Sequence, residues 1–217
     1  MKRLLAGGSG SIYQLAHAFR DGEVGRRHAV EFTMLEWYRV GFDHHRLMDE
    51  VEALVGLLLP DHGSKPFERR SYRDVFVQGA GIDPFDTTVA QVCAACQRAN
   101  VPVPAGIVDA DGPEILDEAL DLLLVLQIEP QLGRHRPTFV LDYPASQAAL
   151  ARLDTDDQGC AVARRFELYV DGVELANGYH ELVDAAEQRQ RFEKANAERR
   201  ALGKSELPID EALLAAL

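Results

Sequence analysis

The chain has 217 residues and a formal net charge of −12, from 35 acidic and 23 basic side chains. This balance argues against the broad cationic surface that extensive phosphate-backbone binding requires, although a small anionic ligand can still occupy a local basic pocket. The composition, 47% hydrophobic and 27% charged, is that of a globular protein. No apolar run approaches the roughly 20 residues needed to cross a bilayer, so no membrane span is expected.

The first elements are predicted to form a hairpin. Strands over 12–20 and 30–40 flank the glycine-rich, charged loop "DGEVGRRH". Alternation along the second strand places Phe32, Glu36 and Tyr38 on one face.

A mainly helical block is predicted over 43–133. It opens with "DHHRLMDEVEALVGLLLP", whose apolar residues have helical spacing until Pro60 ends the run. "TTVAQVCAACQRAN" and "GPEILDEALDLLLVLQ" are the clearest later helices. His44 and His45 lack cysteine or acidic partners at ligand spacing, so we expect them to be exposed or to cap the helix rather than to bind a metal.

Three cysteines and the absence of a signal peptide indicate a reducing compartment, the cytoplasm. Cys93 and Cys96 form a CxxC pattern, but no second pair or histidine cluster completes a metal site. On a helix this spacing favours a packing role for both thiols.

The strand pattern resumes at "PTFVLDYP" and at "RRFELYVDGVELANGYHEL". Asp171-Gly172 lies between alternating apolar runs, which predicts a second tight hairpin. A charged helix then follows Asp184, a predicted capping residue. Strands, then helices, then strands predict an α+β fold with an antiparallel sheet flanked by helices and carrying a helical insertion.

The second strand of the later hairpin carries several polar side chains. Asn177, Tyr179 and Glu181 have the same parity, whereas Glu174 has the opposite one and needs a bulge or a different role.

If both hairpins belong to one sheet, Arg20 and His28 can hold phosphate or carboxylate oxygens. Glu36 and Glu181 can hold an ammonium group. This pattern suits a zwitterionic or cationic substrate beside a nucleotide, and the alternative is a solvated sheet face.

Two long stretches carry a family resemblance. "FRDGEVGRRHAVEFTMLEWYR" resembles the second signature motif of class II aminoacyl-tRNA synthetases of the lysyl type, and "GVELANGYHELVDAAEQRQRFE" resembles the strand and helix that follow. Within that family, "PTFVLDYPASQAALARL" and "ELANGYHEL" are most similar to the paralogues that attach (R)-β-lysine to a lysine of elongation factor P.

The resemblance implies ATP and Mg²⁺ as cofactors, lysine or (R)-β-lysine as substrate, and elongation factor P rather than tRNA as acceptor. It implies that Arg20 is the catalytic residue, bridging the substrate carboxylate and the α-phosphate. The implied nucleotide-binding residues are Arg20, Glu23, His28, Phe32, Glu174 and Leu175, with Glu174 also ligating Mg²⁺. The implied substrate-binding residues are Glu36, Tyr38, Asn177, Tyr179 and Glu181.

The family pattern is incomplete in this chain. Against that pattern the chain begins after the first motif and stops before the third, so 1–217 is expected to be a partial catalytic domain with an incomplete core and little or no activity alone. The first motif forms the homodimer interface in complete members, so the oligomeric state stays open. Ala29-Val30 also replaces the usual Asn-Pro of the second motif.

Two alternatives remain. One is a catalytic fragment of a lysyl-tRNA synthetase. The other is a non-catalytic module that retains the nucleotide and amino-acid pocket as a sensor.

Overall fold

The computed structural model describes residues 1–217 except 23–24, 26–28, 64, 109–111 and 202. The described chain divides into two compact units, unit 1 (Met1–Phe42 and Val183–Leu217) and unit 2 (Asp43–Leu182). Among the described residues, no helix combines the length and the apolar character that crossing a membrane requires.

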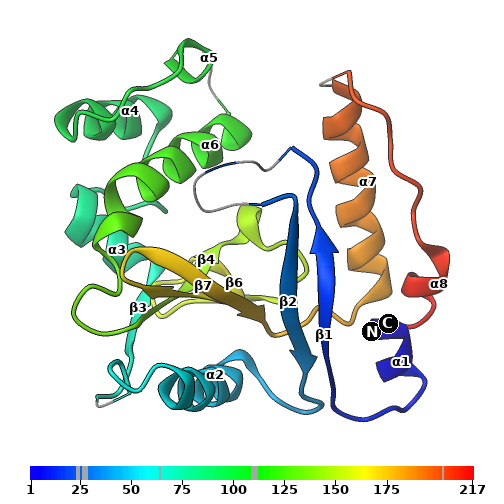
Figure 1. Ribbon diagram of the computed structural model, residues 1–217. Coiled ribbons are helices and arrows are strands. Elements are labelled where there is room, and N and C mark those ends of the chain that lie inside the picture. Colours follow the sequence, from blue (N-terminus) through cyan, green and yellow to red (C-terminus); the bar gives the residue numbers. More distant parts are fainter. Residues whose placement is uncertain (23–24, 26–28, 64, 109–111, 202) are drawn as a thin grey trace. The chain divides into compact units, whose positions relative to one another are not determined.

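Unit 1 contains the first predicted hairpin and the charged helix (Figure 1). Its elements are α1 (Lys2–Ala6), β1 (Ile12–Phe19), β2 (Glu31–Tyr38), α7 (Ala185–Ala201) and α8 (Glu211–Leu214). β1 and β2 pair antiparallel as a two-stranded sheet. The predicted start of α7 is confirmed, because Asp184 Oδ1 accepts hydrogen bonds from the backbone N–H groups of Ala186 (2.8 Å) and Glu187 (2.9 Å).

Unit 2 contains the helical block and a five-stranded sheet. Its helices are α2 (His44–Leu58), α3 (Tyr72–Ala80), α4 (Val89–Arg98), α5 (Ala105–Val108), α6 (Pro113–Leu123), the π-helical η1 (Leu124–Ile128) and the 3-10 turns η2 (Glu129–Gln131) and η3 (Ala145–Gln147). Its strands are β3 (Glu68–Ser71), β4 (Thr138–Pro144), β5 (Leu153–Thr155), β6 (Ala161–Val170) and β7 (Val173–Tyr179).

The sheet of unit 2 has β6 at its centre. The order is β3-β4-β6-β5, and β7 pairs with β6 on the same side as β5. β4, β6 and β7 pair antiparallel as predicted. β5, which pairs antiparallel with β6, and β3, which pairs parallel with β4, were not predicted.

The two predicted hairpins belong to different sheets, so the hypothesis of a shared sheet is wrong at the level of hydrogen bonding. Alternation reveals which face each side chain occupies, but it does not specify which strands pair.

The predicted hairpin of unit 2 is confirmed at its turn. Asp171 (φ 53°) and Gly172 (φ 74°) both have positive φ, which is the conformation of the tight turn that matches strand twist. A Cβ on Gly172 would lie 2.9 Å from the carbonyl oxygen of Pro130, so the close approach of the chain also requires glycine there.

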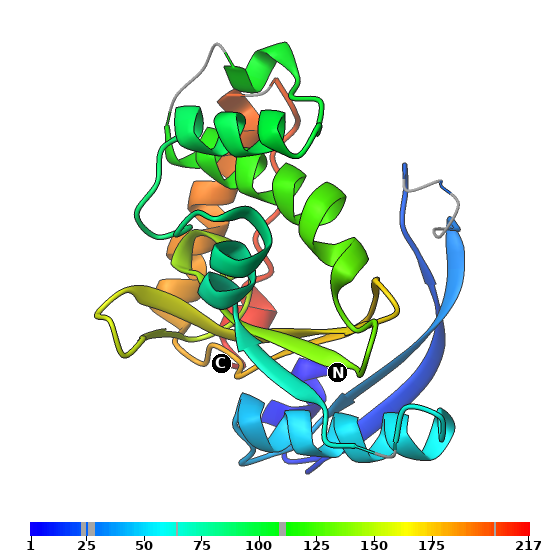
Figure 2. The ribbon, with the colours of Figure 1, turned by 90° about the vertical axis from the view of Figure 1, so that its left-hand side faces the viewer.

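The helices of unit 2 cover both faces of its sheet (Figure 2). On one face, α3, α4 and α6 form the main hydrophobic core with β4 and β6. The largest buried side chains of this core are Tyr72, Phe76, Leu120, Leu123, Tyr143 and Tyr169. On the other face lies α2, whose Leu47 approaches Gly178 of β7 and, with it, Phe166 of β6.

Two expectations about the helical block have clear outcomes. Cys93 and Cys96 are buried in the core as free thiols, which confirms their packing role. His44 is buried, with 3% of its surface exposed, so the expectation that it is exposed is wrong. Asp43 accepts the capping hydrogen bond from the N–H of Arg46, so His44 is the first helical residue and packs inward.

Candidate active site

The predicted site residues of unit 1 share one face of the β1–β2 hairpin. Phe32 pairs with Ala18, Glu36 with Gln14 and Tyr38 with Ile12, and these pairs alternate along both strands. The predicted alternation of Phe32, Glu36 and Tyr38 is therefore confirmed.

Arg20 joins this face from the end of β1. Its backbone N–H donates to the carbonyl oxygen of Val30 (3.0 Å), which continues the ladder by one step. Its guanidinium carbon lies 5.4 Å from the centre of the Phe32 ring, within the range of a cation–π contact. The cation and the ring thus lie together on the same face of the hairpin.

Glu36 is held by its neighbours on the same face. One carboxylate oxygen accepts from Gln14 Nε2 (2.8 Å) and the other accepts from the Tyr38 hydroxyl (2.8 Å). A carboxylate offers about four acceptor positions, so Glu36 keeps capacity for a cationic ligand.

Two predicted nucleotide-binding residues, Glu23 and His28, lie outside the described residues.

The predicted residues of unit 2 are brought onto one face by a β-bulge. Asn177 pairs with Glu167, and Tyr179 pairs with Arg165. The register then shifts, so that Glu174 pairs with Tyr169 and Leu175 is the extra residue. The partners of Tyr179, Asn177 and Glu174 are alternate residues of β6 and therefore share one face of the sheet. The shift thus places Glu174 on the same face as Asn177 and Tyr179, as a bulge was expected to do.

Glu174 and Asn177 are in direct contact on that face. Asn177 Nδ2 donates to Glu174 Oε1 (3.3 Å). Burial and then the nearby carboxylate of Glu167 raise the pKa of Glu174, and the hydrogen bond from Asn177 opposes that rise.

The remaining predicted residues of unit 2 lie along β7 and just beyond its end. Leu175, in the bulge, has 50% of its surface exposed. Tyr179 is half-buried and packs against the main core. Glu181 follows β7 and forms an isolated bridge with Ala151.

A hydrogen-bonded platform on β4 and β6 supports the same face, and the sequence analysis did not predict it. Glu167, whose side chain is 12% exposed, accepts from the hydroxyls of Tyr143 (2.5 Å) and Tyr169 (2.6 Å) and pairs with the guanidinium of Arg165. The Arg165 guanidinium also lies 4.3 Å from the centre of the Tyr143 ring. The signal in the sequence is "RRFELYV", where charged residues alternate with apolar ones in a strand that is otherwise buried.

The two phenols of the platform are donors. Burial, followed by the negative charge of Glu167, raises the pKa of Tyr143 and of Tyr169 well above the ordinary value. Both hydroxyls therefore keep their protons and donate to the carboxyl group of Glu167.

Comparisons with known proteins identify the family. A profile of the class II tRNA synthetases (D, K and N) matches residues 1–216. The chain belongs to the class II tRNA synthetase family.

Several proteins named elongation factor P–(R)-β-lysine ligase are similar to this family member. Identity is 50% over 220 residues for the protein of Edwardsiella ictaluri, 49% over 218 for that of Vibrio cholerae and 48% over 217 for that of Hamiltonella defensa. Each match includes 100% of this chain and 64% of the relative, so the chain spans less than two thirds of the length of these relatives.

The class II site residues fit a magnesium ion that arrives with a nucleotide. Among the residues that the structure describes, no group of three or more His, Cys, Asp or Glu side chains could hold a metal alone. Mg²⁺ is commonly held by one or two carboxylates together with substrate phosphates. Glu174, on the face of β7 that also carries Asn177, is a carboxylate of the type that such a contact requires.

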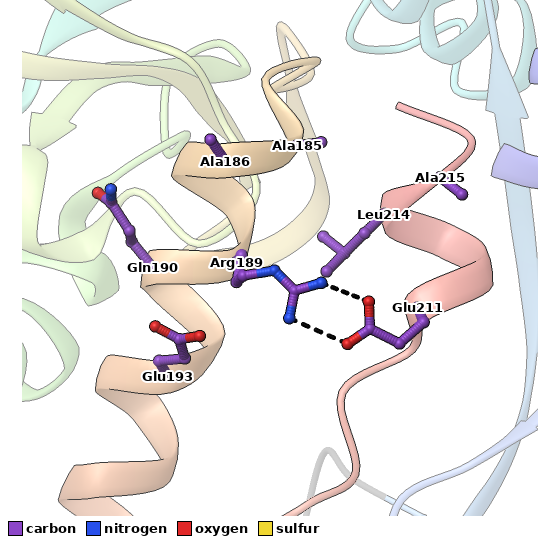
Figure 3. A pocket seen from close by; sticks show the side chains of 8 residues that line it. All are labelled: Ala185, Ala186, Arg189, Gln190, Glu193, Glu211, Leu214 and Ala215. Carbon is purple, nitrogen blue, oxygen red and sulfur yellow. Dashed lines mark hydrogen bonds and ion pairs between the residues drawn. The ribbon is translucent and has the colours of Figure 1, made fainter.

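A hollow in unit 1 lies elsewhere in this class II domain, between α7 and α8 (Figure 3). Arg189 and Glu211 form a bidentate ion pair across it, with Nη1 of Arg189 and Oε1 of Glu211 2.9 Å apart. None of the predicted site residues lines this hollow, so it is separate from the candidate site.

Proposed function

We propose that the protein activates a lysine-type amino acid with ATP and transfers it to a lysine side chain of elongation factor P. The observation that carries the proposal is the identity of 48–50% to ligases of this name along the whole chain. The chain spans 64% of those relatives, so the activity is proposed for the protein to which these residues belong.

Unit 1 is proposed to hold the nucleotide and one end of the amino acid. Arg20 neutralises negative charge between the substrate carboxylate and the α-phosphate, and Phe32 stacks on adenine. Glu36 and Tyr38, which are already hydrogen-bonded to each other, hold an ammonium group. Glu23 and His28 are proposed to contact the nucleotide from the loop.

Unit 2 is proposed to contribute ligand contacts of its own from the face of β7. Glu174 holds Mg²⁺ together with the nucleotide, and Leu175 offers apolar contact to the nucleotide. Asn177, Tyr179 and Glu181 contact the amino acid. When bound, the magnesium ion neutralises phosphate charge.

The proposed chemistry needs no protein nucleophile. A carboxylate oxygen of the amino acid attacks the α-phosphorus of ATP, the bond to the β-phosphate breaks, and an aminoacyl-adenylate and pyrophosphate form. The ε-amine of the acceptor lysine then attacks the acyl carbon, AMP leaves, the amide forms and the amine loses its proton. The chain contributes position and charge, chiefly through Arg20.

The free thiols of Cys93, Cys96 and Cys160 agree with a reducing compartment, and we place the reaction in the cytoplasm.

The proposal is tested by ATP–pyrophosphate exchange with L-lysine and (R)-β-lysine, followed by transfer assays with elongation factor P and with tRNA(Lys). Exchange that favours a lysine-type substrate, with transfer to elongation factor P, is expected. Arg20→Ala is expected to lower exchange about 10²-fold, as loss of one transition-state donor does. Arg39→Ala serves as the control, because it removes the same positive charge from the residue directly after β2, whose parity is opposite to that of Glu36 and Tyr38.

The other outcomes overturn the proposal in distinct ways. Charging of tRNA(Lys) without transfer to elongation factor P would make the protein a lysyl-tRNA synthetase. Binding of ATP or lysine without pyrophosphate exchange would make it a binding module.

A further inference from the structure

Tyr169 lies at the β-bulge of the unit 2 sheet. β6 and β7 run side by side (Figure 1), and their register shifts between Leu168 and Tyr169 of β6, so that Leu175 is the extra residue of β7. Tyr169 is thereby the direct partner of Glu174, and residues paired in this way carry their side chains on the same face of a sheet. The position of Glu174 on the face of Asn177 therefore depends on the register at Tyr169.

The hydroxyl of Tyr169 lies between two carboxylates. The side chain is fully buried, and its oxygen is 2.6 Å from Glu167 Oε2 and 3.1 Å from Glu129 Oε1. Glu167 belongs to β6, whereas Glu129 belongs to η2, so one side chain connects the sheet with the segment that precedes β4. Burial, then Glu167 and then Glu129 raise the pKa of Tyr169, so the hydroxyl keeps its proton as a donor.

The backbone of the same segment is attached to the turn beside Tyr169. The N–H of Gly172 donates to the carbonyl oxygen of Leu132 (2.8 Å), and the N–H of Asp171 donates to that of Gly133 (3.1 Å). A Cβ on Gly133 would collide with the carbonyl oxygen of Tyr169, so the two segments approach as closely as glycine allows. The segment after η1 thus fixes both the turn and the strand end at which the bulge begins.

The hydroxyl of Tyr169 adds nothing to the filling of the core, because phenylalanine would occupy the same space. Burying a hydroxyl costs stability unless it is hydrogen-bonded, and here its contacts join two elements at the point where the register changes. Bulges beside functional sites commonly redirect a side chain. The side chain that this bulge redirects is Glu174.

We propose that Tyr169 is a positioning residue that sets the β-bulge and so places the Glu174 carboxylate where it holds Mg²⁺ with the nucleotide. The inference rests on the proposed function, in which Glu174 is the contact to Mg²⁺. Tyr169 is fully buried and acts through Glu174 rather than on the ligand itself. Groups that orient a metal-binding side chain in this way contribute roughly 10- to 100-fold to metal affinity.

Tyr169→Phe tests the proposal on the full chain, because it removes the hydroxyl and keeps the ring. Tyr72→Phe is the matched control: Tyr72 is also fully buried, but its hydroxyl has no hydrogen-bond partner at normal geometry among the described residues. ATP is titrated calorimetrically into each protein at a series of Mg²⁺ concentrations. Tyr169→Phe is expected to need about tenfold more Mg²⁺ for the half-maximal gain in ATP affinity, whereas Tyr72→Phe is expected to match the unaltered chain.

ATP binding without Mg²⁺ separates positioning from general damage to the fold. A positioning role predicts the same metal-free affinity in Tyr169→Phe and in the unaltered chain, because Glu174 acts through the metal. A merely structural role predicts weaker ATP binding both with and without Mg²⁺, and that result would overturn the assignment.

Hydrogen exchange measures the bulge without any ligand. Amide exchange of residues 173–179 is expected to become faster in Tyr169→Phe and to stay unchanged in Tyr72→Phe. Tyr143→Phe removes the other phenol donor from Glu167 Oε2, but from β4, which does not pair with β7. It is expected to raise the Mg²⁺ requirement less than Tyr169→Phe does.

The failures are distinguishable. If the unaltered chain does not bind ATP, or binds it equally well with and without Mg²⁺, the proposed role of Glu174 and this assignment are both overturned. If Mg²⁺ strengthens ATP binding and Tyr169→Phe needs no more of it, or exchanges residues 173–179 no faster, only the assignment is overturned. An equal shift in Tyr143→Phe would also overturn it, because the effect would then come through Glu167 rather than the bulge.

Discussion

His44 makes the stability of unit 2 depend on pH. The imidazole is 3% exposed, and neither ring nitrogen has a hydrogen-bond partner. Burial, then His45 and then Arg164 lower the pKa of His44 from 6.5 to about 4. In the unfolded chain the ring regains its ordinary pKa, so between pH 6.5 and 4 the unfolded state binds the extra proton.

The sign and size of the effect follow from this difference. The free energy of unfolding falls as the pH drops through that window, because protonation favours the unfolded chain. From pH 7 to pH 4.5, a pKa lowered from 6.5 to about 4 removes about 2–3 kcal/mol from the free energy of unfolding. This loss is a large share of the stability of a domain, about 5–15 kcal/mol.

The variant His44→Leu removes the titrating group and both unpaired nitrogens. Urea unfolding at pH 7 and at pH 4.5 gives the acid loss for each protein, and the carboxylates common to both cancel in the difference. His44→Leu is expected to lose about 2–3 kcal/mol less than the unaltered chain, while His45→Gln, at the exposed neighbour, retains most of the acid loss. Equal acid losses in the unaltered chain and His44→Leu would refute the reasoning.

Three further substitutions test the packing around the site by urea unfolding at pH 7. Gly178→Ala is expected to lower the free energy of unfolding by about 1–3 kcal/mol, because its Cβ would lie 2.6 Å from Cζ of Phe166; an unchanged midpoint would show that β7 shifts freely. Tyr143→Phe is expected to lower the free energy of unfolding by about 1–3 kcal/mol, because Glu167 loses a buried hydrogen-bond donor. An unchanged free energy of unfolding would show that this hydrogen bond does not stabilise the folded protein. Arg73→Lys is expected to cost about 1–3 kcal/mol, since an ammonium group cannot reproduce a guanidinium that bridges two carboxylates and a thiol; wild-type stability would contradict that.

The sequence predicted local structure where the chemistry is local. Asp171-Gly172 predicted the β6–β7 turn because few residues accept two successive positive φ angles. Parity indicated that Glu174 needed either a bulge to join Asn177 or a different role, and the register shift at Leu175 supplies the bulge. These features depend on a few neighbouring residues, so a single sequence contains the necessary information.

The strands β3 and β5 were missed for the opposite reason. β3 is "ERRS", four residues with three charges, and it is ordered by parallel pairing with β4, which lies far along the chain. β5 has three residues, all exposed. Strand propensity and alternation carry no signal for such segments, because their order comes from a long-range partner.

Family resemblance and alternation predicted candidate ligand-binding residues. Neither predicted the residues whose surroundings depend on how other helices and strands pack. Glu167 looks in the sequence like one acid on an alternating strand, and only the pairing of β4 with β6 shows that it lies beside the Tyr143 hydroxyl. Similarly, the burial of His44 follows from Asp43 being the cap, which the run "DHH" does not specify.

The two faces of the β6–β7 hairpin explain how the sheet carries charge in a buried setting. Phe166 and Leu168 turn towards the α2 face and have no exposed surface, so that face supplies apolar burial. The alternate residues Arg165 and Glu167 satisfy each other and two phenols on the opposite face. Such a network stabilises a buried strand only when its members are satisfied. The carboxylate of Glu167 is satisfied by three donors, whereas Arg165 Nε is buried without a hydrogen-bond partner among the described residues, so the sheet carries this charge at some cost in stability.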